Sequence, residues 1–285
     1  MKNQRLRELM NRPGIIIAPG VSDAIGARLV EKVGFHVCYM TGNGAVASMM
    51  GKPDIGVATM TEMVQRAHYL ASCISIPLIS DADNGYGGLN NVKRTVEEFE
   101  AAGVSAVHIE DQASPKKCGA MEGIQLVSTE EMAEKIRIAV KARKDPDFMI
   151  IARSDSRKVL GFEESLRRAR AYADAGADVV YVEMLESREE ILKLTTSVDA
   201  PVLYDMLELF PENIYSSQEL EGLGVKIVIY CLSTTLYAAN RVKEMLEILQ
   251  QTGTTSSLFD KMMPLHDYEE LLGLTEEINI RQMLG

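Results

Sequence analysis

The sequence lacks several features that would place it in common protein classes. No apolar run approaches the roughly 20 residues that a membrane helix needs, and the first apolar run is too short for a secretory signal. The four cysteines lie far apart without CxxC spacing, which argues against a disulfide framework or structural zinc. The formal net charge is −11, and no basic cluster is longer than Lys116-Lys117, which argues against a nucleic-acid partner. We therefore expect a reduced, cytoplasmic protein that binds neither membranes nor nucleic acid.

What the chain does contain is a regular alternation of two patterns. Short apolar runs rich in β-branched residues are typical of parallel strands buried on both faces. These runs are Ile15–Ala18, Val37–Met40, Pro77–Ser80, Ala106–Ile109, Met149–Ala152, Val179–Val182, Pro201–Leu203 and Lys226–Tyr230. Between them, apolar residues recur every three or four positions among charged ones, as in amphipathic helices. Eight such repeats without a flexible linker predict one (β/α)8 TIM-type barrel rather than two doubly wound domains.

Helix boundary signals agree with this alternation. Ser128, Ser187 and Ser216 each precede a glutamate by three residues, which is the pattern of a capping box. After the eighth strand, Ser233–Gln250 predicts one long helix and Asp267–Met283 predicts further helix. We expect residues 1–285 to form a single barrel domain, with 241–285 as a C-terminal helical extension. That extension packs either on a neighbouring subunit or on its own barrel.

Acidic residues follow two adjacent strands. The active site of such a barrel lies at the carboxyl ends of its strands. Asp81 and Asp83 are two apart, so on an extended chain they point to one face, and Glu110 ends the next strand. Three carboxylates at one point repel each other, and oxygen ligands suit Mg²⁺ or Mn²⁺. The alternative is that the aspartates cap a helix and that Glu110 pairs with Arg153.

The connection between Gln112 and Ser128 is longer than the roughly 2–6 residues usual for such loops, and long loops at an active face are commonly lids. It contains Lys116-Lys117-Cys118-Gly119, where nearby positive charge should favour the cysteine thiolate. The alternative is an ordinary exposed loop cysteine. His108 lies within an apolar strand, where it either orients a substrate oxygen or is a satisfied core histidine.

Six segments together resemble the isocitrate lyase and phosphoenolpyruvate mutase superfamily, in particular its methylisocitrate lyase and 2,3-dimethylmalate lyase branch. They are Thr41-Gly42, Gly51 to Gly56, Asp81 to Gly87, His108 to Gln112, Lys116 to Gly119, and Asp145 to Asp155. The similarity extends over nearly the whole chain. It implies a barrel whose last helix is exchanged between subunits of a homotetramer.

The resemblance also implies roles for individual residues. One Mg²⁺ would be held directly by Asp83, with Asp54, Asp81 and Glu110 acting mainly through waters. Thr41, Gly42 and Asn43, together with Arg153, would hold the carboxylate of a pyruvate or glyoxylate unit. Cys118 would protonate the second product, and Glu183 would position the substrate. The remaining expected site residues are Lys116 as a catalytic residue, and His108, Gly119 and Asp205 as substrate contacts.

The implied activity is a carbon–carbon lyase that cleaves a malate-like 2-hydroxy acid, of the 2,3-dimethylmalate or 2-methylisocitrate type, into an α-keto acid and a carboxylate. Alternatives are an oxaloacetate decarboxylase or hydrolase, a phosphonopyruvate-type enzyme, and a non-catalytic barrel that binds a keto acid. Cys118 favours the lyase, because decarboxylation needs no protein acid there. The acidic residues argue against a non-catalytic barrel.

Four positions depart from the methylisocitrate lyase pattern. Ala120 stands where those enzymes have histidine, Asp205 where they have asparagine, Phe210 where they have glycine and Leu236 where they have arginine. These changes remove hydrogen-bond donors or space for the second fragment. A further substrate carboxylate would then face Asp205 uncompensated, unless that side chain is neutral. We therefore expect methylisocitrate and isocitrate to be poor substrates.

Overall fold

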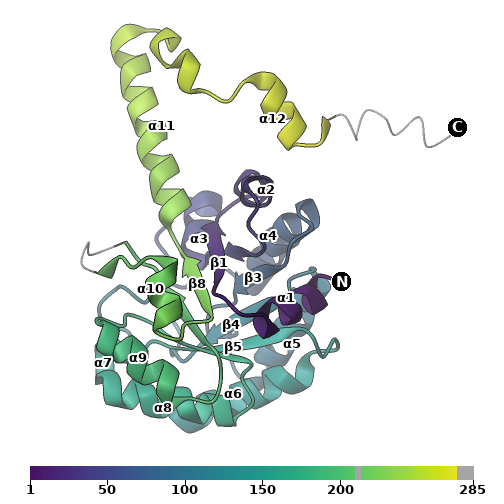
Figure 1. Ribbon diagram of the computed structural model, residues 1–285, viewed down its shortest axis with the longest axis vertical. Coiled ribbons are helices and arrows are strands. Elements are labelled where there is room, and N and C mark those ends of the chain that lie inside the picture. The colour runs from purple at the N-terminus through teal and green to yellow at the C-terminus, as the bar shows by residue number, and fades with distance from the viewer. Residues whose placement is uncertain (209–212, 275–285) are drawn as a thin grey trace, which may run out of the picture.

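The computed structural model describes residues 1–208 and 213–274, and it shows a closed barrel of eight parallel strands (Figure 1). The strands are β1 (Ile16–Val21), β2 (Cys38–Met40), β3 (Leu78–Asp81), β4 (Ala106–Glu110), β5 (Met149–Ser154), β6 (Val179–Val182), β7 (Val202–Asp205) and β8 (Ile227–Tyr230). They follow one another in sequence order, and β8 pairs with β1 to close the ring. The predicted (β/α)8 barrel and all eight predicted strands are confirmed.

Helices surround this ring. They are α1 (Lys2–Asn11), α2 (Ala24–Val33), α3 (Gly42–Met50), α4 (Met60–Cys73), α5 (Leu89–Ala101), α6 (Thr129–Ala142), α7 (Ser156–Leu160), α8 (Phe162–Asp174), α9 (Arg188–Ser197) and α10 (Ser217–Gly222). Ser128, Ser187 and Ser216 each accept the N–H of the residue three positions on, as predicted, and Ser216 completes a full capping box with Glu219. None of the described helices is both long and apolar enough to cross a bilayer.

The interior of the barrel changes character along its axis. Inward-facing aliphatic side chains such as Ile79, Ile151 and Leu203 are fully buried. Each such side chain contributes on the order of 1.5–3 kcal/mol to folding by leaving water. Towards the carboxyl ends of the strands, Tyr39 and Tyr181 take their place, also buried. The hydrophobic core therefore ends in a polar layer, and that layer forms the floor of the site.

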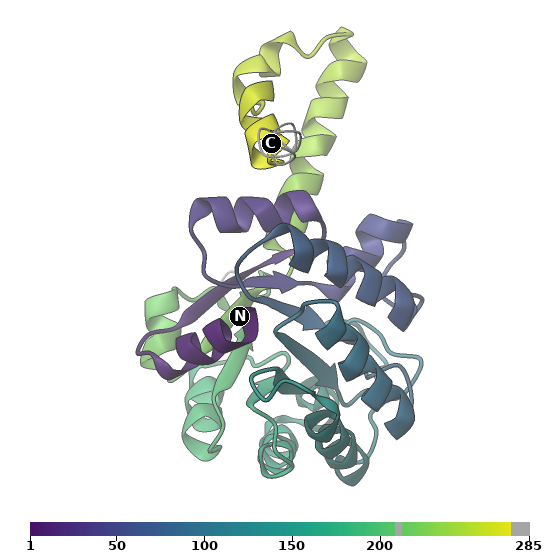
Figure 2. The same ribbon diagram turned by 90° about the vertical axis from the view of Figure 1, so that its right-hand side faces the viewer.

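The C-terminal part leaves the barrel (Figures 1 and 2). Helix α11 (Ser233–Thr252) projects outward and buries none of its residues, and the 3-10 helix η2 (Ser256–Lys261) and α12 (Leu265–Leu271) follow it. Helix α12 returns to α2, where Arg28 Nη1 donates to the Leu271 carbonyl at 3.1 Å. The part of the expected helix beyond residue 274 lies outside the described residues, as does Phe210.

Candidate active site

The acidic run after β3 does not follow strand geometry. The strand ends at Asp81, and Asp83 has a left-handed φ of 47°. The expectation that strand alternation puts both carboxylates on one face is therefore wrong. Instead, the backbone folds back so that the Asp83 N–H donates to Asp81 Oδ1 at 2.9 Å. This turn holds the two aspartates at the end of β3, and both are buried.

A lysine ammonium lies among these acids. Lys116 Nζ is 2.7 Å from Asp54 Oδ1 and also forms an ion pair with Asp83. Only 5% of Lys116 is exposed, so this long side chain has been taken out of water to reach the acids. Burial alone would lower the pKa of Lys116, but the charges of Asp83, Glu110 and Asp81 outweigh it and raise that pKa well above its usual value. Lys116 is therefore a fixed positive charge at the site.

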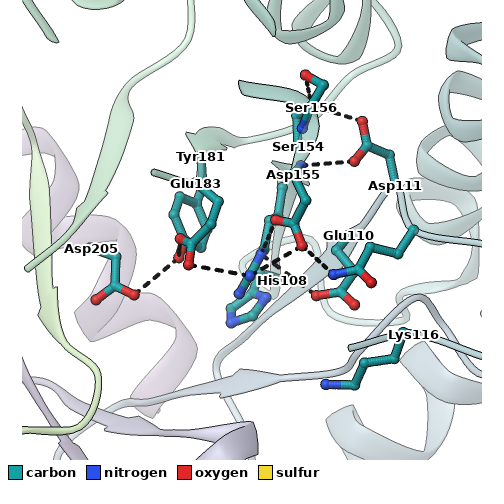
Figure 3. Close-up of polar contacts among 12 residues, drawn as sticks. His108, Glu110, Asp111, Lys116, Ser154, Asp155, Ser156, Tyr181, Glu183 and Asp205 are labelled. Atoms are coloured by element: carbon teal, nitrogen blue, oxygen red, sulfur yellow. Dashed lines mark hydrogen bonds and ion pairs between the residues drawn. The ribbon is translucent and has the colours of Figure 1, made fainter. Parts of the chain in front are cut away.

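Glu110 lies near Lys116, and its carboxylate has an incomplete set of contacts (Figure 3). Its Oε2 lies 3.5 Å from Arg153 Nε, and its buried Oε1 has no hydrogen-bond partner. Burial raises the pKa of Glu110 well above its usual range, and burial together with Asp81 and Asp54 raises that of Asp83 to about 6. Such shifts mark carboxylates whose negative charge is not fully neutralised.

The fit to a divalent cation can be tested on these residues. Among residues 1–208 and 213–274, no three His, Cys, Asp or Glu side chains are arranged as the ligands of a metal ion. The expected meeting of Asp81, Asp83 and Glu110 at one point is therefore not found. The carboxylate oxygens of these acids are nevertheless hard donors that surround the Lys116 ammonium, and Glu110 Oε1 among them has no hydrogen-bond partner. This arrangement fits Mg²⁺ held by few carboxylates, with water completing its octahedron.

The long connection after β4 is folded over the site. Its two sides pair, with the Ala113 N–H donating to the Gln125 carbonyl at 2.8 Å. Its tip is anchored where the Cys118 N–H donates to the Asp54 carbonyl at 2.9 Å. A Cβ at Gly119 would lie 2.5 Å from Arg153 Nη2, so only glycine permits this close approach. The loop therefore delivers Lys116 and Cys118 to the same site.

The surroundings of Cys118 favour the thiol over the thiolate. Burial raises the pKa of Cys118, and Glu183 adds to the rise, whereas Asn43 and the backbone of Ala120 act in the opposite direction. The expectation that the neighbouring lysines favour the thiolate is wrong. Lys116 is paired with carboxylates, and Lys117 Nζ donates to the Glu122 carbonyl at 3.2 Å. A protonated thiol suits a proton donor better than a nucleophile.

Arg153 is held at the end of β5 by several acids. Its Nε donates to Asp155 Oδ1 at 2.6 Å, and its Nη2 lies 3.5 Å from Glu183 Oε1. The guanidinium also stacks 5.0 Å from the centre of the Tyr181 ring. Because both flanks of the fork are fixed, the arginine presents a preorganised positive charge. This is the group that could hold a substrate carboxylate.

The start of α3 forms a second carboxylate-binding element. Thr41 caps the helix by accepting the Gly44 N–H at 3.2 Å, and the first turn consists of Gly42, Asn43 and Gly44. Free N–H groups and the helix dipole favour an anion at such a terminus. A side chain at Gly42 would collide with Asp81 Oδ2, so the helix start and the acidic run are in direct contact.

The ends of β6 and β7 carry Tyr181, Glu183 and Asp205, which lie on the side of the site away from Lys116 (Figure 3). Tyr181 Oη donates to Glu183 Oε2, and it lies 3.2 Å from Asp205 Oδ2. His108 is fully buried beneath them, with its Nε2 2.8 Å from Tyr39 Oη. Burial lowers the pKa of His108 to about 4, so the ring is neutral. The structure thus places His108 in the floor of the site, as a hydrogen-bonded core histidine.

Sequence reasoning missed two groups. Tyr181 reads as a packing residue of an apolar strand, although it stands two residues before Glu183 and therefore faces the same way. Behind the site, Asp111 accepts from Ser154 Oγ at 2.7 Å and from Arg168 Nη1 at 2.9 Å. Nothing local signals that pair, because Arg168 lies on α8. Of the departures, Leu236 lies on α11 and is 54% exposed, away from this cluster.

The chain resembles curated enzymes over almost its full length. It is 41% identical to 2,3-dimethylmalate lyase of Eubacterium barkeri over 270 residues, which are 95% of this chain and 93% of that protein. It is 38% identical to 2-methylisocitrate lyase of Aeropyrum pernix over 268 residues, which are 94% of this chain and 86% of that protein. Both relatives carry names of carbon–carbon lyases.

Solved structures give the same result. A complex of oxaloacetate acetylhydrolase with 3,3-difluorooxalacetate has a TM-score of 0.94 at 34% identity, covering 100% of this chain and 97% of that one. A structure of 2,3-dimethylmalate lyase has a TM-score of 0.93 at 37% identity, covering 100% and 96%. A complex of phosphonopyruvate hydrolase with oxalate and Mg²⁺ has a TM-score of 0.90 at 30% identity, covering 99% and 98%. Residues 6–250 match the family described as phosphoenolpyruvate phosphomutase, and the chain therefore belongs to that family, within the superfamily that its motifs indicate.

Proposed function

We propose that this protein is a Mg²⁺-dependent carbon–carbon lyase. It cleaves a malate-like 2-hydroxy acid, of the 2,3-dimethylmalate or 2-methylisocitrate type, into an α-keto acid and a carboxylate. The observation that carries the proposal is the loop over the site. One short segment of it brings Lys116 to the acidic residues and Cys118-Gly119 to Arg153 and Glu183. A proton donor and a cation site would then lie over the same strand ends, as retro-aldol cleavage requires.

The acidic residues would hold the metal. Asp83 would bind Mg²⁺ directly, and Asp54, Asp81 and Glu110 would act mainly through waters. Three observations support this assignment. All the donor atoms are oxygens, Glu110 Oε1 has no hydrogen-bond partner, and the similar structure of phosphonopyruvate hydrolase is a complex with oxalate and Mg²⁺. Bound Mg²⁺ would supply a Lewis acid for the negative charge that develops on the keto acid oxygens. Manganese could serve in the same way, because it accepts the same ligands.

The chain's own residues would carry out the remaining steps. The N–H groups at Thr41, Gly42 and Asn43, with the Arg153 guanidinium, would bind the carboxylate of the keto acid unit. Glu183, fixed by Arg153, would orient the bond to be broken. The proton of the substrate hydroxyl would pass to Glu110, whose Oε1 has no hydrogen-bond partner, as the carbonyl of the keto acid forms. The Cys118 thiol would give its proton to the carbon released on cleavage and regain one from solvent when the products leave. The closed loop would keep water away from that carbon. Lys116 would offset part of the negative charge on the acidic side of the site.

A product assay separates the lyase from its rivals. Purified enzyme with Mg²⁺ is offered 2,3-dimethylmalate, 2-methylisocitrate, oxaloacetate and phosphonopyruvate, and the released acids are identified. We expect pyruvate from a 2-hydroxy acid. Loss of oxaloacetate alone would favour the oxaloacetate acetylhydrolase-like alternative, which the structural similarity makes the main rival. Binding of oxalate without turnover of any compound would indicate a non-catalytic barrel.

We also propose that the protein is a homo-oligomer, a tetramer by resemblance, in which α11 is exchanged. Helix α11 exposes Leu236, Tyr237, Val242 and Leu246, an apolar set that a lone chain would leave in water. Beside it, a groove of about 730 Å³ runs between β1, α2 and the start of α11, and residues such as Ile25, Leu29 and Phe35 line it. The extension 241–285 of a second copy is the proposed occupant. Sedimentation equilibrium tests this assembly.

The proposed setting is the cytoplasm. All four cysteines are unpaired, which is the state expected in a reducing compartment. A small anionic 2-hydroxy or 2-keto acid is the proposed partner of the site, because Arg153 and the α3 start both favour a carboxylate. Fractionation with an antibody against the protein tests the location.

A further inference from the structure

The β6 and β7 side of the site contains two acids joined by one phenol (Figure 3). Tyr181 Oη lies within hydrogen-bonding distance of Glu183 Oε2 and 3.2 Å from Asp205 Oδ2. All three side chains are more than nine-tenths buried. A phenol donates one hydrogen, and an ionised carboxylate donates none. Both contacts are therefore hydrogen bonds only if one carboxyl carries a proton and donates it to the phenol oxygen.

Charge assigns that proton to Asp205. Arg153 Nη2 lies 3.5 Å from Glu183 Oε1 and stabilises the ionised form of that acid. Within the described part of the chain, no cation forms an ion pair with Asp205. The titratable groups that face Asp205 are Glu183, Arg153, Tyr181, Tyr39 and Cys231. Burial raises the pKa of both acids. The pKa of Asp205 lies well above its usual value because the Glu183 charge adds to burial, although Arg153 and the Cys231 backbone act in the opposite direction.

The position of the proton decides what Asp205 offers to a substrate. Oδ2 is the oxygen at Tyr181, so it carries the proton in the shared bond. Oδ1 points away from Tyr181, is buried and has no hydrogen-bond partner (Figure 3). It is thus a carbonyl oxygen, which accepts hydrogen bonds and donates none. A neutral Asp205 of this kind still lacks a donor for a substrate carboxylate.

Barrel topology shows which part of the substrate would meet Asp205. In a closed ring of eight strands in sequence order, β7 lies opposite β3. The keto acid unit belongs to the β3 side, with the acidic residues and the start of α3. The second fragment then extends towards β7. An additional carboxylate on that fragment would meet the Oδ1 acceptor and, beyond it, the Glu183 charge.

We propose that Asp205 is a protonated, specificity-determining residue whose carbonyl oxygen disfavours a second fragment with an additional carboxylate. This inference rests on the proposed lyase function and narrows its substrate. The preferred substrate releases a monocarboxylate, as 2,3-dimethylmalate would, rather than the dicarboxylate that 2-methylisocitrate would release. Asp205 would therefore disfavour a second carboxylate without carrying a negative charge. Its proton is held in the hydrogen bond to Tyr181, and only the acceptor oxygen Oδ1 is left for the substrate.

Infrared spectroscopy of the full-length enzyme tests the protonation without any turnover. A difference spectrum of wild type against Asp205→Asn at neutral pH should show the carbonyl band of a carboxylic acid that only the wild type contains. Tyr181→Phe, which keeps Asp205 but removes its partner, should shift that band. Absence of the band in the wild type overturns the proposal. Asp199→Asn, at the exposed amino end of β7, is the matched control and should leave the band unchanged.

Kinetics test the specificity. We expect kcat/KM for 2,3-dimethylmalate to exceed that for 2-methylisocitrate, and Asp205→Asn to reduce this ratio by about tenfold or more, because its amide can donate to a carboxylate. Asp199→Asn should keep the wild-type ratio. An unchanged ratio in Asp205→Asn, with pyruvate still released, overturns the specificity role but leaves the lyase intact. No cleavage of either acid by the wild type overturns the proposed function itself, and with it the substrate preference drawn here.

Discussion

The two sides of the barrel mouth deal with buried negative charge in different ways. At β3, Asp54 and Asp83 face an ammonium group, and Glu110 keeps an oxygen without a partner. At β6 and β7, Glu183 and Asp205 both contact the Tyr181 hydroxyl, and the Arg153 guanidinium forms an ion pair with Glu183 alone of these two acids. The first arrangement leaves a demand for a cation. The second reduces its charge by holding a proton.

This difference separates two tasks that one site must perform. The β3 side has the oxygen donors that a hard cation requires, and a cation held there would serve any substrate that contains a keto acid unit. The β7 side presents an acceptor oxygen, which discriminates between second fragments. The relatives are named for different substrates, including 2,3-dimethylmalate and 2-methylisocitrate, while the barrel remains closely similar. Reaction type and substrate choice can therefore reside on opposite strands.

The loop that connects the two sides should give the largest effect. Cys118→Ser removes the thiol acid but keeps a similar shape, so cleavage should fall by roughly 10²–10⁴-fold. Binding of oxalate in the presence of Mg²⁺, measured by calorimetry, should persist, because the substitution leaves Arg153, the start of α3 and the acidic residues in place. Cys73→Ser, on α4 away from the site, is the matched control. Full turnover in Cys118→Ser would show that Cys118 is not the proton donor of the cleavage.

Loss of the buried ion pair between Asp111 and Arg168, behind the site, should give the next largest effect. Arg168→Met leaves Asp111 buried without its cation, which should lower the free energy of unfolding by about 3–5 kcal/mol. Arg167→Met removes the exposed neighbour on the same helix, which pairs with Glu164, and should cost only about 0.3–0.5 kcal/mol. Urea denaturation measures both. Equal losses would mean that the buried pair does not support the β5 end.

Removing one acid from the β3 side should affect the cation but not the proton on the β7 side. Asp83→Asn should weaken Mg²⁺ binding by about tenfold or more, since a charged ligand becomes neutral. The infrared band assigned to Asp205 should remain. Asp174→Asn, exposed at the end of α8, is the control. If Mg²⁺ affinity measured by calorimetry is unchanged, the metal is held elsewhere.

The smallest effect on the site should come from the projecting helix. Leu246→Glu places a charge on the exposed apolar face of α11, so we expect weaker self-association in sedimentation experiments. Barrel stability should change by less than about 0.5 kcal/mol, because α11 buries none of its residues in a single chain. Lys243→Glu, at a polar position of the same helix, is the control. Unchanged association would place the interface elsewhere.

Much of this fold is predictable because its signals are local. Apolar β-branched runs and serine caps are read within a few residues, and all eight strands follow from them. Asp83 shows where local reasoning fails, since its left-handed backbone breaks the two-residue period. The location of Lys116 depends on a contact with Asp54, 62 residues earlier in the chain. In the sequence, Tyr181 has the pattern of a core residue, and only the structure shows that its hydroxyl contacts Glu183 and Asp205. Long-range contacts of this kind have no local signature.

The central claim is that cleavage leaves a keto acid on the β3 side and delivers a proton to the other fragment. The most direct test is to treat 2,3-dimethylmalate with the wild-type enzyme and Mg²⁺ in deuterium oxide and to follow the products by NMR. We predict equal amounts of pyruvate and of propionate carrying a single deuteron next to its carboxylate. Intact 2,3-dimethylmalate, with oxaloacetate hydrolysed under the same conditions, would contradict the lyase assignment.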